Sequence, residues 1–168
     1  MHHIGRLSET EPDVDRLHDA PFPEVDPPYR RFRFDLGAMP EPSGGIGLAG
    51  FEGANVGGAV AQVILGPDSG ASQLNLMVVR YGPGGFITEH DHAFEEGFLF
   101  VEGEVEAVLD GETHTLGASD YFWSGVGSPH ALTNRSGKPV RWLETQVPQP
   151  PSRYQARFFA DWRRFIHG

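Results

Sequence analysis

Four residues of types that bind metal ions are grouped in two short segments of the chain. His90 and His92 are two residues apart, Glu96 follows four residues later, and His130 lies close to Asn134. Side chains alternate between the two faces of a β-strand, so His90 and His92 would project from the same face. Glu96 on the next element and His130 on a later strand could complete a shell around one divalent cation. Such a shell would leave about two positions open on a six-coordinate ion, as chemistry on a bound substrate requires.

The types of donor atom restrict the choice of metal. Nitrogen and oxygen donors without thiolate suit Mn, Fe, Co, Ni or Zn, and we expect one divalent ion per chain, with Fe or Mn favoured. The sequence has no cysteine, so disulfides and thiolate ligands are excluded. A closed structural zinc site is less favoured, because such sites usually include cysteine. Histidines that are satisfied by hydrogen bonds alone are the alternative to a metal site.

Short apolar segments with high β-propensity follow one another at a regular spacing and are separated by turn residues. They cover residues 59–65, 74–81, 98–101, 105–109, 113–116, 120–124, 131–134 and 140–146. Asp110-Gly111 is the strongest turn signal, because both central residues of a type I′ hairpin turn favour positive φ. About eight short strands of this kind predict an all-β fold, either an antiparallel barrel or a double-sheet jelly roll.

The composition favours one turn-rich globular domain and argues against several partners. The 168 residues include 22 Gly and 14 Pro, which favours many short strands over long helices. The net charge is −10 and no run of Lys and Arg exists, so we expect no binding to nucleic acid or to an anionic membrane. No apolar stretch approaches the roughly 18 residues of a membrane span, and no secretory signal is recognisable. We therefore expect a cytoplasmic protein that acts on a small molecule.

Two flanking segments are expected outside a β-barrel formed by residues 31–148. Residues 1–30 are polar and rich in proline, which predicts an extended arm with little structure of its own. Residues 149–168 carry apolar side chains at helical spacing after a possible N-cap at Ser152, which predicts a short helix packed on the barrel. The arm and the strand predicted over residues 31–36 suggest pairing with a neighbouring subunit, so we predict a homodimer.

The spacing around the histidines is that of a known pair of motifs. The first sequence motif of the cupin superfamily is matched at every defined position, by Gly84, His90, His92, Glu96 and Gly103. The second motif is matched in part, by Gly127, His130 and Asn134, and departs from the family at Gly125 and Ser119. Over residues 70–148 the chain resembles the small single-domain cupins. The resemblance implies a double-stranded β-helix in which His90, His92, Glu96 and His130 converge on one ion, and it also implies a dimer.

The residues that line the pocket beside the metal are less defined, because alternation leaves the inward face of each strand open. In residues 74–81 one face carries Leu74, Leu76, Val78 and Arg80, and the other carries Asn75, Met77, Val79 and Tyr81. In residues 140–146 the faces carry Val140, Trp142, Glu144 and Gln146, or Arg141, Leu143 and Thr145. Tyr81, Gln146 and Phe86 are pocket candidates. Tyr81 and Glu96 could move protons, and Arg80 could hold a substrate carboxylate.

Three functions fit these residues. The first is an oxidoreductase of the dioxygenase type, in which Fe or Mn binds an oxygen-rich organic substrate and dioxygen together. The second is a Lewis-acid isomerase, lyase, decarboxylase or hydrolase that acts on a sugar, a hydroxy acid or a keto acid. The third is a ligand-binding barrel without catalytic activity. We rank them in this order, and activity without air would separate the second from the first.

Overall fold

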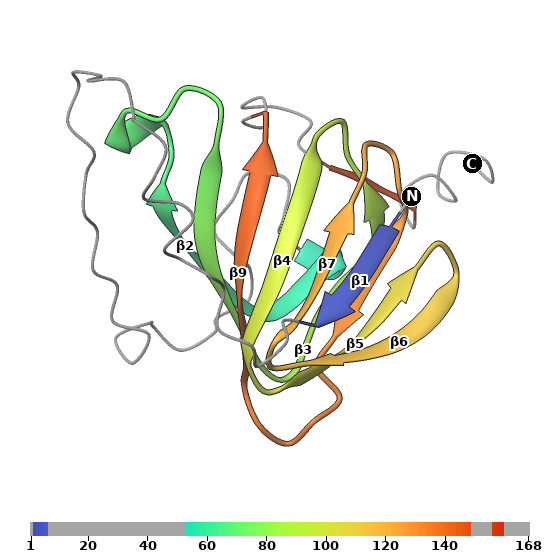
Figure 1. Cartoon of the computed structure of the whole chain (residues 1–168). Coiled ribbons are helices and arrows are strands. Elements are labelled where there is room, and N and C mark those ends of the chain that lie inside the picture. Colours follow the sequence, from blue (N-terminus) through green and yellow to red (C-terminus); the bar gives the residue numbers. More distant parts are fainter. Residues whose placement is uncertain (1, 7–52, 149–155, 160–168) are drawn as a thin grey trace.

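The computed structural model describes residues 2–6, 53–148 and 156–159 (Figure 1). These residues form ten strands, namely β1 (His2–Arg6), β2 (Val56–Leu65), β3 (Asn75–Asp91), β4 (Glu95–Glu102), β5 (Glu104–Leu109), β6 (Glu112–Gly117), β7 (Asp120–Ser124), β8 (His130–Thr133), β9 (Val140–Val147) and β10 (Arg157–Phe158). Two short 3-10 turns, η3 (Gly53–Asn55) and η4 (Pro67–Ser69), flank β2. The fold is the all-β antiparallel jelly roll that the sequence predicted.

Strand β3 connects the two halves of the jelly roll. The strand order is β1-β7-β4-β9-β3-β8-β5-β6, with β2 and β10 also paired to β3. The first half of β3 pairs with β9 up to Tyr81, whereas the second half pairs with β8 from Phe86 onward. Figure 1 shows β9, β4, β7 and β1 side by side on one half, with β5 and β6 on the other. Any site between the halves therefore receives side chains from both.

Glycines make the change of partner along β3 possible. A Cβ atom on Gly85 would lie 2.6 Å from the carbonyl oxygen of Gly58 on β2, and Gly84 has a φ of +74°. Neither the close approach of β2 nor the positive φ suits a residue with a side chain. The sequence analysis had ended a strand at Tyr81, but the glycines let the same strand bend and continue to the histidines.

Alternating side chains build the core between the two halves. In β4, β7 and β9 buried side chains alternate with more exposed ones. In β9 the buried residues are Val140, Trp142, Glu144 and Gln146. The buried aromatic side chains include Phe98, Phe100, Phe122 and Trp142. The rings of Phe98 and Phe122 stack with their centroids 4.1 Å apart. The core aromatics thus come from the inner face of the first half and extend up to the histidines.

The hairpin between β5 and β6 has the turn that the sequence predicted. Asp110 and Gly111 both have positive φ, at 51° and 85°. β5 and β6 pair in register from Glu104 opposite Gly117 to Leu109 opposite Glu112. A two-residue turn with both φ values positive matches the right-handed twist of the strands that it joins.

The flanking segments differ in part from the predictions. Residues 2–6 of the expected arm form β1, which pairs antiparallel with β7 of the same chain. Arg157 and Phe158, predicted to be helical, form β10 instead and pair with Asp91 and His90 of β3. Backbone hydrogen bonds to the free edge of β3 therefore override the helical spacing there. The predicted strand over residues 31–36, the rest of the arm and the rest of the C-terminal helix lie outside the described residues.

Within the part of the chain that the structure describes, no helix has both the length and the apolar character needed to cross a membrane.

Candidate metal centre

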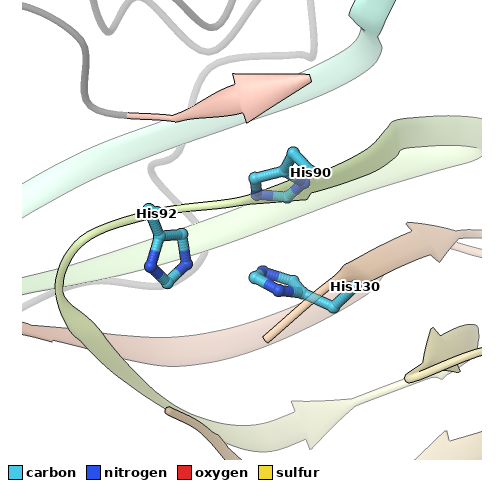
Figure 2. Close-up of side chains that lie close together, drawn as sticks. All are labelled: His90, His92 and His130. Atoms are coloured by element: carbon cyan, nitrogen blue, oxygen red, sulfur yellow. The ribbon is translucent and has the colours of Figure 1, made fainter. Parts of the chain in front are cut away.

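The three predicted histidine ligands meet between the two halves of the jelly roll. His90 comes from the end of β3, His92 from the turn that follows, and His130 from the first position of β8. One ring nitrogen of each lies within 4.8 Å of those of the other two, and Figure 2 shows the three rings facing a common space. All three side chains are buried. The His-x-His spacing works as predicted, although His92 lies one residue beyond the strand.

Backbone carbonyl groups fix the orientation of each imidazole ring. Nδ1 of His90 lies 3.0 Å from the carbonyl oxygen of Thr88, Nδ1 of His92 lies 2.7 Å from that of Phe94, and Nδ1 of His130 lies 3.0 Å from that of Ser128. A carbonyl oxygen can only accept, so each Nδ1 carries the proton that it donates. Nε2 of His92 holds a second proton, which it donates to Glu96 and would have to give up to a metal. With Nδ1 protonated and Nε2 deprotonated, each ring could bind a metal through Nε2. This is the tautomer that metal-binding histidines commonly adopt.

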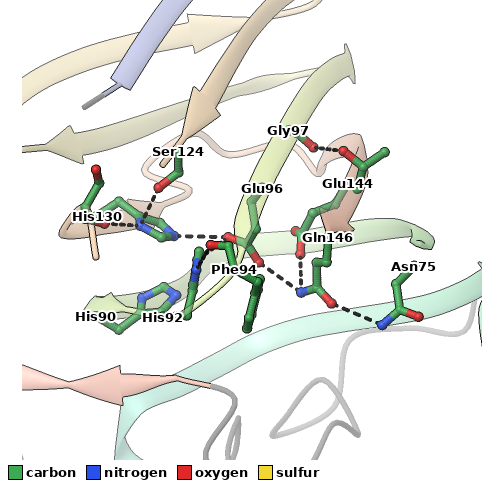
Figure 3. A network of polar contacts seen from close by, with 12 residues as sticks. Asn75, His90, His92, Phe94, Glu96, Gly97, Ser124, His130, Glu144 and Gln146 are labelled. Carbon is green, nitrogen blue, oxygen red and sulfur yellow. Dashed lines mark hydrogen bonds and ion pairs between the residues drawn. The ribbon is translucent and has the colours of Figure 1, made fainter. Parts of the chain in front are cut away.

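Glu96 on β4 completes the set of four predicted ligands. Its Oε2 lies 2.7 Å from Nε2 of His92 and 3.3 Å from Nε2 of His130. Its other oxygen, Oε1, accepts a hydrogen bond of 2.9 Å from Nε2 of Gln146 (Figure 3). Three imidazoles and one carboxylate that face the same space form a donor set suited to a first-row divalent ion. The residues therefore fit the metal that the donor pattern predicted.

The electrostatics of the four groups favour a charged carboxylate among neutral and charged imidazoles. Burial alone would raise the pKa of Glu96, but hydrogen bonds from His130 and His92 outweigh it, so the pKa lies well below its usual 4.5. Burial lowers the pKa of His90 well below 6.5, and the nearby His130 lowers it further. Burial also lowers the pKa of His92, yet the hydrogen bond to Glu96 raises it above 6.5 overall. Glu96 is thus ionised and ready to bind a cation.

A small cavity lies beside these residues. Its volume is about 20 Å³, which holds roughly one or two water molecules. Its walls are formed by Met77, Val79, Tyr81, Ile87, His90, Glu96, Phe98, His130, Leu132, Trp142, Glu144 and Gln146. The walls are apolar except near the histidines and on β9. The space suits an ion with a few small ligand atoms.

The structure resolves which strand faces point inward. Tyr81, with Met77 and Val79, lines the cavity, so the pocket prediction for Tyr81 is consistent with the geometry. Arg80 projects from the opposite face of β3, where it lies across from Arg141 of β9. Arg80 is not among the cavity residues and is badly placed to hold a substrate there. Phe86 does not line the cavity either, and Glu95 is exposed, on the face opposite Glu96.

A second carboxylate, Glu144, shares the cavity and was not predicted as a site residue. Its Oε2 accepts a hydrogen bond of 3.0 Å from Nε1 of Trp142, and its Oε1 accepts one of 3.2 Å from Nε2 of Gln146. Burial raises the pKa of Glu144 well above 4.5, and the charge of Glu96 raises it further. Burial likewise raises the pKa of Tyr81 above 10.0. The alternation in β9 placed Glu144 on one face with Trp142 and Gln146, but could not show that this face is the inner one.

The C-terminal strand β10 closes the outer side of His90. The ring of Phe158 stacks on the imidazole of His90 with centroids 5.1 Å apart, and Phe158 is itself buried. Next to it, Nε of Arg157 donates a hydrogen bond of 2.8 Å to Oδ1 of Asp91, and Nη2 of Arg157 contacts Oδ2. A guanidinium that binds both carboxylate oxygens fixes the position of both side chains. Sequence analysis missed this contact, because its partners are 66 residues apart.

A jelly roll with His90 at the end of one strand, His92 just after it and His130 on another strand belongs to a class of β-barrel that can hold a metal ion. Residues 77–145 match the family described as "Cupin domain". A curated relative, "Tetracenomycin polyketide synthase protein TcmJ" of Streptomyces glaucescens, is 30% identical over 96 residues, which are 56% of this chain and 64% of the relative. The match thus spans less than two thirds of that protein. Residues 77–145 thus match the cupin family, as the motif spacing indicated.

Solved structures of low sequence identity share the fold. The polyketide cyclase RemF from Streptomyces resistomycificus superposes with a TM-score of 0.62 at 20% identity, over 77% of this chain and 85% of RemF. An oxalate decarboxylase from Lactobacillus farciminis gives a TM-score of 0.54 at 19% identity, over 64% of this chain and 33% of that one. At these identities the similarity concerns the fold, and the residues of this chain must carry any inference about its chemistry.

Proposed function

We propose that the protein is a mononuclear metal enzyme that acts on a small, oxygen-rich organic substrate. The observation that carries this proposal is the arrangement of the three buried histidines, whose Nδ1 atoms are all held by carbonyl groups and whose rings converge on one space beside Glu96. Histidines with only a structural role would not need to turn their rings toward one common point. A divalent ion held there would polarise a carbonyl group and stabilise the negative charge that develops on its oxygen.

Of the reaction classes that fit the sequence, we favour redox-neutral Lewis-acid chemistry on an enolisable carbonyl compound, including ring closure. The relative TcmJ is named as a polyketide synthase protein, and a polyketide chain is rich in carbonyl groups separated by single carbons. The protons between two carbonyl groups are acidic, and a bound cation would stabilise the enolate that their removal leaves, so a metal centre suits this chemistry. RemF supports the fold, and its activity as a cyclase enters only as an analogy.

Other residues of the cavity would orient such a substrate. Tyr81 lines the cavity, and burial raises the pKa of its phenol, so the hydroxyl group keeps its proton and can donate to a substrate oxygen. Met77, Ile87 and Leu132 form apolar walls that exclude water from the reacting atoms. Glu96 stays ionised and serves as a ligand, because its pKa is low.

A dioxygenase-type reaction is the second candidate, and the donor set is compatible with it. Three nitrogen donors and one oxygen donor occupy four positions, so an Fe or Mn ion of six-coordinate preference would keep about two positions for substrate and dioxygen. The same residues would hold the metal in either reaction. The two candidates differ in whether dioxygen is consumed.

The test begins with the metal content of the purified, untagged protein, measured by plasma mass spectrometry. Metal-free protein is then loaded in turn with Zn²⁺, Ni²⁺, Co²⁺, Mn²⁺ and Fe²⁺ and incubated with β-dicarbonyl compounds with and without air. Turnover without air by the Zn²⁺ or Ni²⁺ form supports the Lewis-acid reaction. Turnover that needs air and consumes dioxygen favours the dioxygenase. A protein that binds none of these ions at one equivalent would contradict both candidates.

The homodimer expected from the sequence also stays a proposal. The first residues of the arm pair with β7 of their own chain, so a dimer contact through the arm would have to use residues after Arg6. Light scattering after size exclusion measures the molar mass directly. A mass near 18.4 kDa at micromolar concentration would exclude the dimer, and twice that mass would support it.

A further inference from the structure

Three polar side chains form a row across the inner face of the first half of the barrel. Glu96 on β4 lies directly opposite Gln146 on β9, and Gln146 lies directly opposite Asn75 on β3. Residues that face each other on neighbouring strands and point to the same side have their Cβ atoms about 5 Å apart. Three polar groups are therefore held in line by the register of the sheet, with Glu96 at the end nearest the histidines.

Hydrogen bonds fix the orientation of the amide in the middle of the row (Figure 3). Nε2 of Gln146 donates to Oε1 of Glu96 at 2.9 Å and to Oε1 of Glu144 at 3.2 Å. Oε1 of Gln146 accepts from Nδ2 of Asn75 at 3.3 Å. Glu96 is ionised and can only accept, so the amide nitrogen of Gln146 must face it. Gln146 is 2% exposed and cannot turn toward solvent instead.

The two oxygens of Glu96 consequently have different partners. Oε1 is bound by the amide of Gln146, whereas Oε2 faces Nε2 of His92 and Nε2 of His130. A carboxylate can bind a metal through one oxygen or through both, and a hydrogen bond to one oxygen opposes binding through both. The geometry presents a single oxygen of Glu96 to the space between the histidines.

We propose that Gln146 is a positioning residue that holds Glu96 as a one-oxygen metal ligand and so keeps a coordination position open. The inference rests on the proposed metal centre and adds to it the residue that sets how many positions remain for substrate. Asn75 supports Gln146 from the other side. Without the amide, Glu96 is free to turn and bind through both oxygens, which fills one of the positions that chemistry requires.

A simple packing role for Gln146 makes a different prediction. If the side chain only fills space, its replacement lowers stability and leaves the coordination number of a bound ion unchanged. The number of water molecules on the ion is therefore the decisive quantity. It is measured by the relaxation rate of water protons in a solution of the Mn²⁺-loaded protein, since each exchangeable water bound to Mn²⁺ adds to that rate.

The experiment compares the Mn²⁺-loaded wild type with Gln146→Leu, a replacement of similar size that cannot donate. We expect the variant to bind one equivalent of Mn²⁺ and to show a relaxation rate lower by about two-fold, as about two open positions become one. Thr145→Val is the matched control, because it neighbours Gln146 on β9 but points to the other face. The control should leave the rate unchanged.

Two outcomes would overturn the inference in distinguishable ways. If Gln146→Leu binds one equivalent of Mn²⁺ and its relaxation rate equals that of the wild type, Gln146 does not set the coordination number, although the metal centre stands. If the wild type itself binds no Mn²⁺ or other divalent ion, the metal centre is wrong and the inference falls with it. Should Gln146→Leu not fold, Gln146→Met carries the same prediction, because its flexible side chain fills the space without a donor.

Discussion

Glu96 and Glu144 lie on neighbouring strands of one cavity and are almost equally shielded, with exposed fractions of 4% and 8%. Their environments nevertheless displace the two pKa values in opposite directions. Glu96 contacts two imidazoles and an amide, and its pKa is lowered. Glu144 contacts an indole and the same amide, and its pKa is raised. Removal from water costs both carboxylates the same kind of free energy, so the difference comes from their partners.

The comparison assigns a different role to each of the two carboxylates. Groups that can carry positive charge compensate for the burial of Glu96, whereas neutral donors do not fully compensate for that of Glu144. Glu96 is therefore the carboxylate that is ionised and can bind a cation. Glu144 lies next to Glu96 and binds the same amide nitrogen of Gln146, and its proton reduces the repulsion between the two carboxylates. Only Glu96 was recognisable as a ligand, because only it belongs to a spaced motif.

The largest expected effect comes from removing an imidazole, which breaks the comparison. His130→Ala removes one of the two ring nitrogens beside Oε2 of Glu96 and one predicted ligand. We expect metal affinity to fall by at least about 100-fold, more than the loss typical of an outer-shell partner. Competition with a chromophoric chelator measures the affinity. His114→Ala is the control, since His114 lies partly exposed on β6 outside the site. Equal affinity in the two variants would contradict the site.

The second effect concerns Glu96 in the metal-free protein. Glu96→Gln removes the charge that faces His92 and His130, and we expect the free energy of unfolding at pH 7 to fall by about 3 kcal/mol. The folded pKa of Glu96 lies below the usual 4.5, so its stabilisation is present above pH 4.5 and is lost as the pH falls through the folded pKa. Urea denaturation at several pH values measures this. A difference from wild type that does not shrink toward acidic pH would be inconsistent with the low pKa.

A smaller effect on the free energy of unfolding is expected from removing the hydrogen-bond donor to Glu144. Trp142→Phe removes the donor to Oε2 of Glu144 and some buried volume, and should cost about 2 kcal/mol in the free energy of unfolding. Trp123→Phe is the matched control, because Trp123 lies on the outer face of β7. Urea denaturation of both variants compares them directly. If the two replacements cost the same, the hydrogen bond from Trp142 contributes nothing measurable.

The smallest effect sharpens the comparison. Glu144→Gln should change the free energy of unfolding of the metal-free protein by less than about 1 kcal/mol near pH 5, because a protonated carboxyl and an amide are both neutral. The folded pKa of Glu144 lies above 4.5, so the stability that it contributes is complete below pH 4.5 and is lost as the pH rises through the folded pKa. The variant should therefore gain stability relative to wild type as the pH rises. The opposite trend would show that Glu144 is ionised in the fold.

Much of the fold and the ligand set could be predicted because both depend on local spacing. The period of two placed His90 and His92 on one face, and Asp110-Gly111 set the turn between β5 and β6. Glu96 and His130 were expected from their residue types as ligands that could complete the shell, and the cupin motifs name the same two residues. The structure brings the three histidine rings together and places Glu96 against two of them, His92 and His130.

The rest of the site depends on contacts that alternation leaves open. A strand with one residue type on each face can turn either face inward, so Tyr81 and Arg80 were equally acceptable until the partner strands were known. Gln146 was a pocket candidate and does line the cavity, whereas Glu144 was not singled out, although it lies on the same face of β9. The pairing of β10 with β3 depends on an available strand edge. The helical spacing predicted a helix at Arg157 and Phe158, where the structure has a strand.

The stacking of Phe158 on His90 has a practical consequence for handling the protein. A chain shortened before Arg157 would keep every predicted ligand and both cupin motifs, yet one face of the His90 ring would meet bulk water. Affinities measured on such a fragment would describe a more hydrated and less selective centre. Purification tags and limited digestion should therefore be designed so that residues 156–159 stay intact.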